Sequence, residues 1–400
     1  MSSDRPTTPA GRPAAGPPDF ADARNKRQKA RAAGLDPDYW YAVEYEHAVT
    51  AGQVVGTRFW GRDIALYRGE DGTLRALEDR CAHRQLALSR GQVEGCHLTC
   101  MYHGWSYDGT GRVVHYAHDL FGRAQPEVKV RSYPVTARHG LIWLFPGDPT
   151  LAQGRRIPDI PELDGPRPWA RIDADYTWRA HHSMIIDNVS DFTHAYLHRK
   201  YRPFWDARLT HCETVGDTVR LSYDTVIGGG RLTGRFVDRR RVDTTSIDLA
   251  YEYPYQRSDT GGAIKHWCFV LPMDRATTRV FFLFYFDALK IPGTRARVPR
   301  PLMGPLMKAA AALAVRPLLR QDGTAVEAEQ EGYERNFASP LVELNPAVHL
   351  FQDLTIRKWE QYLEREKATS VRRRSSGAGG SSAPPAPAGP LAPDGVPPRG

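Results

Sequence analysis

The chain has 400 residues and a formal net charge of +8, with 41% hydrophobic and 25% charged residues. This length allows two domains with a sizeable core, and the composition is that of a globular protein. The excess charge lies at the ends, because residues 1–36 carry +3 and residues 367–400 carry +4, which leaves about +1 for the rest. Basic terminal segments are usually solvated, so the net charge does not predict binding to nucleic acid.

Both ends of the chain are predicted to be disordered tails. Residues 1–36 are rich in Pro, Ala, Gly and Arg, and residues 368–400 are rich in Gly, Ser, Pro and Ala. Segments of this composition bury too little apolar surface to offset the entropy lost on ordering. The folded part is therefore expected between about residues 37 and 367.

Nothing in the sequence predicts export or a membrane span. The first thirty residues lack the apolar segment of a signal peptide, and the most apolar helical stretch, residues 302–319, contains two prolines and two basic side chains. Five cysteines are too few for a disulfide scaffold. We therefore expect a cytoplasmic protein without an integral membrane segment.

Residues 37–148 are predicted to form a small all-β domain. β-type runs at 39–43, 57–60 and 64–67 are separated by Gly- and Asp-containing turn sequences. A further run at 141–145 is followed by Pro-Gly, which is typical of the exit from a domain. A Pro-rich connector follows this last strand.

Two pairs of metal-ligating residues lie within this β-domain. Cys81-Ala-His83 and Cys100-Met-Tyr-His103 place two thiolates and two imidazoles on two short loops. A set of two Cys and two His suits a two-iron, two-sulfide cluster with Cys on one iron and His on the other. Gly104 follows directly and lets the backbone approach a cluster closely. The pattern predicts a Rieske cluster, which transfers single electrons.

A structural zinc site is the alternative for the same four residues. Zinc also accepts two Cys and two His, but its usual motifs place both Cys before both His. Here the order alternates between Cys and His, which fits one iron receiving a ligand from each loop. The order of the ligands therefore favours the iron–sulfur cluster over zinc.

Residues 149–367 are predicted to form a second, α+β domain. Residues 181–200 lack the alternation of a strand and favour a helix, whereas residues 215–290 alternate like antiparallel strands. Helical patterns return at 302–334 and 350–366. Strands followed by helices are typical of an α+β domain.

The helix predicted at 181–200 carries a second candidate metal site. His194 and His198 are four residues apart, so on a helix they would share one face. Asp187 and Asp191 would extend this polar stripe among apolar neighbours. Such a stripe is costly to bury unless it binds something, and two such imidazoles can bind one metal.

A non-haem iron site with two His also needs one carboxylate, which leaves positions open for dioxygen and substrate. The candidate is Asp322, which opens a helical stretch far along the chain. An Asp at such a position is ordinarily a helix cap or part of a turn. Spacing alone therefore leaves its role open.

Four motifs together resemble the catalytic α subunits of Rieske non-haem iron oxygenases, the aromatic-ring-hydroxylating oxygenase superfamily. The chain looks most similar to α-only members such as the pheophorbide and chlorophyllide oxygenases, over roughly residues 38–365. The motifs are Cys81-x-His83, Cys100-x-x-His103-Gly-Trp, Asp187-Asn188-x-x-Asp191-x-x-His194 with His198, and Gln321-Asp322.

The resemblance implies a role for each motif. The cluster ligands would be Cys81, His83, Cys100 and His103, and the ligands of mononuclear Fe(II) would be His194, His198 and Asp322. Asp191, with Asn188 of the same motif, would be catalytic, because Asp191 would bridge a cluster His of one subunit and an iron His of its neighbour. This arrangement implies a homotrimer. The second domain would have the helix-grip, START-like antiparallel sheet of the family.

One departure from the family concerns the spacing of the two iron histidines. The usual motif is H-x4-H, whereas this chain has H-x3-H. On an ideal helix, five residues span about 140° of rotation beyond a full turn, so the usual spacing needs local distortion. The shorter spacing needs less distortion, but it predicts a local geometry different from that of the family.

The resulting prediction is the terminal component of an oxygenase, with O2 as co-substrate. Since no dinucleotide-binding loop or plant-type ferredoxin motif is present, electrons are expected from a separate ferredoxin or NAD(P)H-dependent reductase. Hydroxylation, demethylation, desaturation and cyclisation, with one or both oxygen atoms used, are all compatible with such a site. Two alternatives are a Rieske electron-transfer protein without oxygenase chemistry and a zinc-stabilised binding module.

The substrate is predicted only by class. Tyr251, Tyr253, Trp267 and Phe269 lie in the predicted strands and would suit an apolar, polycyclic small molecule. The same aromatic side chains would equally serve as an ordinary core.

Overall fold

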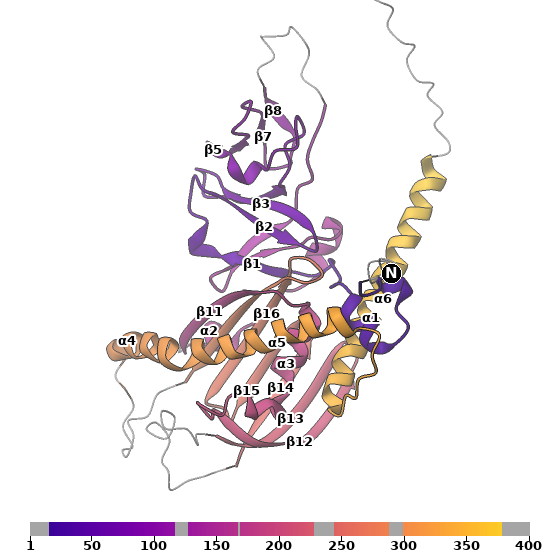
Figure 1. Ribbon diagram of the computed structural model, residues 1–400. Helices are drawn as coiled ribbons and strands as arrows, with labels where there is room; N and C mark the ends of the chain where they lie inside the picture. The colour runs from indigo at the N-terminus through magenta and orange to yellow at the C-terminus, as the bar shows by residue number, and fades with distance from the viewer. Residues whose placement is uncertain are drawn as a thin grey trace, which may run out of the picture. The chain divides into compact units, whose positions relative to one another are not determined.

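The computed structural model describes residues 16–116, 127–166, 169–227, 244–287, 298 and 300–377 (Figure 1). The chain divides into two compact units within its last helix, after Trp359. The larger unit contains the predicted β-domain and the predicted second domain as far as Trp359, and the described part of the smaller unit is helical. In the part of the chain that is described, no helix has the length and apolar content needed to span a bilayer.

The first domain consists of three small antiparallel sheets. Their strand orders are β1-β10-β9, β2-β3-β4 and β5-β6-β7-β8. The strands are β1 (Tyr41–Tyr45), β2 (Val54–Phe59), β3 (Arg62–Arg68), β4 (Leu74–Glu78), β5 (Gln92–Glu94), β6 (His97–Thr99), β7 (Ser106–Tyr107), β8 (Val113–His115), β9 (Val135–Arg138) and β10 (Leu141–Leu144). The all-β prediction for this region is confirmed.

The second domain is a seven-stranded antiparallel sheet with helices on one face. The strand order is β11-β17-β16-β15-β14-β13-β12. The strands are β11 (Ala170–Trp178), β12 (Phe204–Val215), β13 (Thr218–Ile227), β14 (Thr244–Glu252), β15 (Tyr255–Thr260), β16 (Ile264–Pro272) and β17 (Thr278–Phe286). This sheet and its helices confirm the predicted α+β class.

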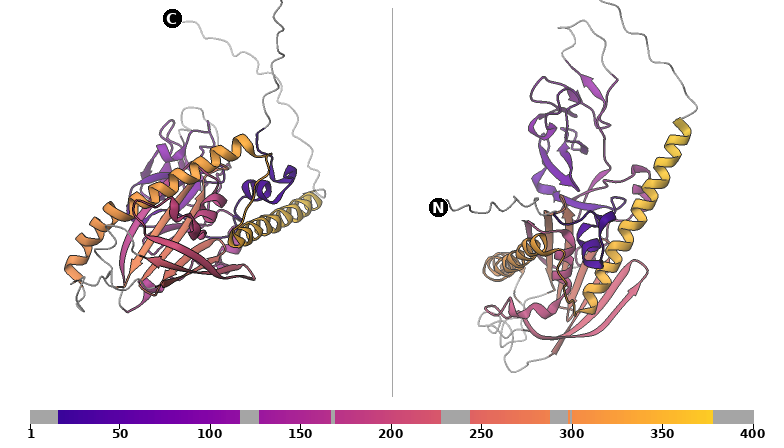
Figure 2. Two further views of the ribbon diagram at one scale, coloured as in Figure 1. Left: turned by 60° about the horizontal axis from the view of Figure 1, so that its bottom comes forward. Right: turned by 45° about the vertical axis from the view of Figure 1, so that its right-hand side comes forward.

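Helix α5 (Arg316–Asn336) lies across the sheet, and α3 (His182–Ser190) packs between α5 and β16 (Figures 1 and 2). The buried residues of α5 recur at alternating spacings of four and three residues, which is one face of an α-helix. Its buried residues are Leu319, Gly323, Val326, Gln330 and Tyr333. The other long helices are α4 (Arg300–Ala310), which a π-helical turn at Ala311–Val315 joins to α5, and α6 (Pro346–Gly377).

The opposite face of the sheet packs against the first domain. Trp143 of β10 is fully buried and makes an edge contact with Phe269 of β16 at 5.0 Å between ring centroids. Arg279 of β17 donates to Glu44 of β1 at 2.7 Å. Strands with one face on helices and the other on a second sheet are buried on both sides, which explains the continuous apolar run of β17.

The structure differs from the sequence-based prediction at both ends. Helix α1 (Lys26–Ala32) lies inside the segment predicted as a disordered tail, and its Gln28, Ala30, Arg31 and Ala32 are buried. Asn25 begins this helix by accepting a hydrogen bond from the Gln28 N–H at 2.9 Å. At the other end, α6 continues ten residues beyond the predicted limit of 367.

The packing of α5 on the sheet gives a matched pair of substitutions. A Cβ on Gly323 would overlap the indole of Trp178, whereas a Cβ on Gly332 would meet nothing within 4 Å. We expect Gly323→Ala to lower the free energy of unfolding by about 1–3 kcal/mol through overpacking. Gly332→Ala should raise it by up to about 1 kcal/mol through helix propensity. Urea denaturation of both variants measures the difference, and equal effects would contradict this packing of α5.

Candidate metal centres

The two loops that carry the Cys and His pairs have the same backbone geometry. The N–H of Cys81 donates to the Leu86 carbonyl, and the N–H of Gln85 donates back to the Cys81 carbonyl, both at 2.8 Å. In the second loop, Cys100 pairs with the Trp105 carbonyl at 2.8 Å and with the Gly104 N–H at 3.1 Å. Each loop is therefore a turn closed between its Cys and the residues four and five positions later.

A left-handed residue makes each of these turns possible. Gln85 has φ of 60° and Gly104 has φ of 66°, and both stand four residues after the Cys of their loop. Glycine adopts this conformation without strain. Gly104 is therefore explained by the left-handed position that the turn requires. The C-x-H and C-x-x-H loops share the same pattern of backbone hydrogen bonds around their Cys residues.

The four side chains form two pairs, the two Cys and the two His, that differ in exposure. Cys81 and Cys100 are 2% and 3% exposed, whereas His83 and His103 are exposed. The two imidazole rings are 4.6 Å apart, and His83 stacks on Trp105 at 5.0 Å. A cluster held here would have its thiolate side inside the domain and its imidazole side at the surface.

The electrostatics of these side chains fit a cationic metal cluster. Burial raises the pKa of the Cys100 thiol, so a thiolate there needs a nearby positive charge. Partial desolvation, together with the nearby His103 and Arg84, lowers the pKa of His83, which favours the neutral imidazole that binds metals. The Tyr107 hydroxyl lies 3.2 Å from the Cys81 sulfur and accepts from the Ala82 N–H at 2.9 Å, so its own hydrogen is free for the sulfur.

The second site is formed by three side chains that converge from two segments. The Nε2 atom of His198 lies 3.2 Å from Asp322 Oδ1, and that of His194 lies 3.6 Å from the same oxygen. One ligand atom from each residue lies within 4.8 Å of the others. Two His and one carboxylate in this arrangement match the facial set of non-haem iron. The sequence spacing left open whether Asp322 is a helix cap, part of a turn or a metal ligand. In the structure Asp322 lies beside both histidines.

The surroundings of this site orient its ligands. The Nδ1 atom of His198 lies 2.9 Å from Gln321 Oε1, so this ring nitrogen donates to Gln321 while Nε2 faces Asp322. Phe204 presents an edge contact to both imidazoles, at 5.5 Å to His194 and 5.7 Å to His198. The buried Oδ1 atom of Asp322 accepts no hydrogen bond. A bound cation would satisfy this oxygen.

The pKa values of the two histidines shift in opposite directions. Burial lowers the pKa of His194 despite the nearby Asp322. Burial also acts on His198, but the carboxylate of Asp322, 3.2 Å from its Nε2 atom, outweighs it and raises the pKa of that imidazole. Asp322 therefore favours the protonated form of the His198 imidazole, and a metal ion would compete with that proton.

The single helix predicted at 181–200 is wrong. Helix α3 ends at Ser190, Asp191 has extended backbone angles, and a 3-10 turn follows at Phe192–Tyr196. Asp191 begins this turn by accepting from the N–H and the hydroxyl of Thr193, at 2.8 and 2.6 Å. The H-x3-H spacing thus spans a 3-10 turn and the residues after it, and the two rings lie 5.2 Å apart.

The break also separates the predicted polar stripe. Asp187 lies on α3, is buried, and forms an ion pair with Arg31 at 2.8 Å, so it does not share a face with the two histidines. Asn188 lies on the last turn of α3, where its carbonyl accepts from the Asp191 N–H at 3.3 Å. Asp191 is partly exposed.

The aromatic side chains proposed for a substrate pocket belong to the core. Trp267 stacks on Phe269, which in turn contacts Trp143 of the first domain. Tyr253 contacts Tyr39 at 5.2 Å. Tyr251 is fully buried and contacts Phe351 of α6. The core interpretation of these four residues is therefore the correct one.

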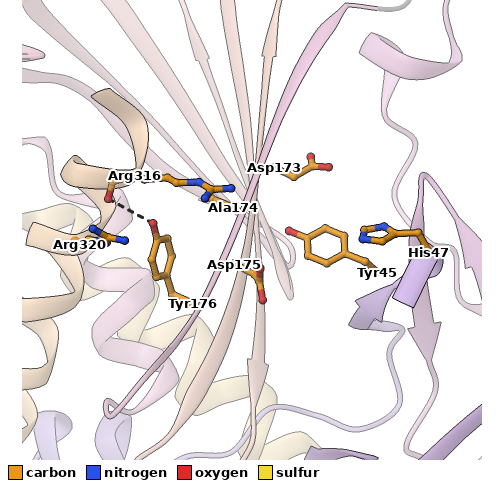
Figure 3. Close-up of a pocket in the computed structure, with 8 residues that line it drawn as sticks. All are labelled: Tyr45, His47, Asp173, Ala174, Asp175, Tyr176, Arg316 and Arg320. Carbon is orange, nitrogen blue, oxygen red and sulfur yellow. Dashed lines mark hydrogen bonds between the residues drawn. The ribbon is translucent and has the colours of Figure 1, made fainter. Parts of the chain in front are cut away.

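A polar pocket of about 390 Å³ lies apart from both candidate metal sites (Figure 3). Tyr45 and His47 face Arg316 and Arg320 across β11 in this view. The remaining lining residues are Asp173, Ala174, Asp175 and Tyr176. It contains none of the predicted site residues, and its charged walls do not suit an apolar substrate.

Sequence reasoning missed several residues that support the two sites. Phe204, Tyr107 and Arg31 contact the candidate ligands or the helices that carry them. None of them belongs to a motif with a fixed spacing. Only the placement of β7, β12 and α1 in the folded chain reveals them.

Two family models match separate parts of the chain. Residues 39–129 match the family model of the Rieske [2Fe-2S] domain, and residues 178–366 match the vanillate O-demethylase oxygenase C-terminal domain. The crystal structure of dicamba monooxygenase bound to dicamba superposes with a TM-score of 0.64 at 24% identity, over 85% of this chain and 100% of that chain. That likeness establishes the fold.

The chain is also similar in sequence to curated proteins. The chain is 36% identical over 166 residues to the oxygenase component of dicamba O-demethylase from Stenotrophomonas maltophilia, over 40% of this chain and 47% of the relative. It is 46% identical over 339 residues to a 4β-methylsterol monooxygenase from Methylococcus capsulatus, over 84% of this chain and 92% of the relative. A match of this extent and identity sets aside the zinc-module and electron-carrier alternatives. The chain belongs to the Rieske non-haem iron oxygenases, as a terminal oxygenase with a [2Fe-2S] cluster, mononuclear Fe(II) and O2 as co-substrate.

Proposed function

We propose that this protein oxidises the methyl group of a 4-methylsterol or a closely related polycyclic alcohol. The proposal rests on the 46% identity to a 4β-methylsterol monooxygenase over nearly the whole of both chains. It agrees with the apolar substrate class expected from the sequence. The other oxygenase relative, a dicamba O-demethylase, matches over less than half of each chain and supports the reaction type rather than this substrate.

The residue assignments form the second part of the proposal. Cys81, His83, Cys100 and His103 hold the cluster, since the two Cys are buried and the two His exposed on equivalent loops. His194, His198 and Asp322 hold Fe(II), which supplies the site for activating O2 when bound. Gln321, whose Oε1 atom lies 2.9 Å from Nδ1 of His198, orients this ring so that its Nε2 atom faces Asp322.

Asp191 provides the path between the two centres in this proposal. Asp191 stands three residues before His194. Its side chain is partly exposed and accepts a hydrogen bond from the Thr193 N–H. The cluster histidines, His83 and His103, are also exposed. Exposed groups at both ends of the path suit a contact between subunits, so we infer a homotrimer in which Asp191 of one subunit meets a cluster histidine of the next. Electrons enter from a separate ferredoxin or reductase.

An assay with purified protein, a surrogate ferredoxin–reductase pair, NADH and O2 tests the substrate. We expect a 4-methylsterol to yield oxygenated product by mass spectrometry, with incorporation of ¹⁸O from ¹⁸O2. The matched sterol without the 4-methyl group should yield none. Equal oxidation of both sterols, or of neither while the loaded enzyme oxidises another compound, would overturn the substrate assignment.

A further inference from the structure

Helix α1 inserts one arginine between the two helices that lead to the candidate iron ligands. Arg31 is 8% exposed, and its guanidinium donates to three side chains. On α3 it contacts Ser183 Oγ at 2.7 Å and Asp187 Oδ2 at 2.8 Å. On α5 it contacts Glu329 Oε1 at 2.8 Å. One side chain therefore ties α3 to α5.

The buried carboxylate of Asp187 needs the positive charge of Arg31. Asp187 is buried, and burial raises the pKa of its carboxyl to about 6 even though Arg31 is adjacent. The side-chain N–H of Gln352 supplies a further hydrogen bond to Asp187 at 3.0 Å. Without the guanidinium, an ionised Asp187 would be left buried, with this amide as its one remaining side-chain partner among the described residues. The ion pair thus fixes the position of α3 as well as joining it to α5.

Both tied helices lead directly to the iron site. Asp191 follows the last residue of α3, and the turn that it caps carries His194. On α5, Glu329 lies seven residues after Asp322, which is almost two full turns, so both side chains project from nearly the same side of the helix. A shift of α3 against α5 would therefore change the distance between the two histidines and Asp322.

Other contacts hold α1 in place independently of Arg31. The imidazole of His182 pairs with the Ala33 carbonyl at 2.8 Å, and the side-chain amide of Gln28 donates to the Phe337 carbonyl at 3.1 Å. Asp36 N–H donates to the Tyr253 hydroxyl at 2.8 Å. Loss of the guanidinium alone should therefore leave α1 docked.

We propose that Arg31 is a positioning residue for the mononuclear iron site, holding α3 and α5 at the separation at which His194, His198 and Asp322 bind one metal ion. This inference rests on the proposed ligand assignment. It gives the N-terminal segment, which lies outside both family matches, a role in metal binding.

The test compares Arg31→Met with Arg27→Met on the same helix. Arg27 stacks over Tyr333 at 4.9 Å and serves as the matched control. We expect Arg31→Met to lower the iron content from about three toward two atoms per chain and to change the EPR spectrum of the Fe(II)–nitric oxide adduct. The EPR signal of the reduced cluster should stay unchanged. Arg27→Met should keep three irons, and Arg31→Lys should recover part of the lost iron.

A second variant separates positioning from folding. Arg31→Met with Asp187→Leu replaces the buried ion pair by apolar side chains, which preserves folding in many proteins. Native thermal stability with weakened iron binding in this variant supports the proposal. The proposal would be overturned if Arg31→Met, or the double variant with Asp187→Leu, bound as much iron as wild type. Loss of the cluster signal together with the iron would also overturn it. A wild-type protein that binds two irons, unchanged by His194→Ala, would instead contradict the ligand assignment itself.

Discussion

Replacement of His194 by Ala should remove one iron atom per chain and all turnover while leaving the Rieske cluster intact. The imidazole is one of only three protein ligands that the described residues bring together at this site. With two ligands left, a divalent iron would be held mainly by water and would dissociate. The cluster loops lie in the other domain, between β4 and β7, so their spectrum should not change.

Iron analysis and EPR spectroscopy of the purified variant measure this outcome. Wild type should contain about three irons per chain and His194→Ala about two, with the same rhombic signal of the reduced cluster. His211→Ala is a matched control, because His211 is 54% exposed and pairs only with Glu213 at 3.6 Å in the described structure. If the cluster signal disappeared with the mononuclear iron, the assignment of two separate sites would be wrong.

Asp322 offers an independent check on the same centre. Its Oδ1 atom is buried, unsatisfied by hydrogen bonds and within 3.6 Å of both imidazoles. The sequence spacing alone did not decide whether Asp322 is a helix cap or a metal ligand. The structure excludes the cap interpretation, because α5 begins at Arg316 and Asp322 lies inside the helix.

The sites that could be predicted from sequence are those whose ligands lie close together in the chain. The Cys81–His83 and Cys100–His103 loops are short, and each turn closes on itself through hydrogen bonds within six residues. Such local geometry follows from the motif. The fold class followed for a similar reason, since alternating strands in the second domain pair mostly with their sequence neighbours.

The predictions that failed depended on contacts between distant segments or on competing local signals. The helix at 181–200 was extended through Asp191, although Asp-x-Thr is a sequence that favours a new helix start. Asp187 was grouped with the histidines because an unbroken helix would align them. Its actual partner, Arg31, is 156 positions away and lies in a segment whose composition predicts disorder. No spacing rule connects two such residues.

Asp191→Asn should slow electron transfer to the mononuclear site while both metal centres remain loaded. Asn accepts the same capping hydrogen bonds as Asp, so the turn that begins at Phe192 should persist. The substitution removes the negative charge that would pair with histidines at both ends of the proposed path. Loss of a carboxylate partner of a metal-bound histidine typically costs about 10- to 100-fold in activity.

Stopped-flow measurement of cluster reoxidation, with O2 and substrate present, gives the rate directly. We expect Asp191→Asn to lower this rate by at least about tenfold, with three irons per chain and the same oligomeric state by sedimentation. Thr193→Ala is the control, because it removes one of the two hydrogen bonds to Asp191 but keeps the carboxylate. Loss of iron in Asp191→Asn would show that the residue acts on the metal site through local structure. An unchanged rate would mean that electrons reach the iron by another path, since the charge of Asp191 would then be dispensable.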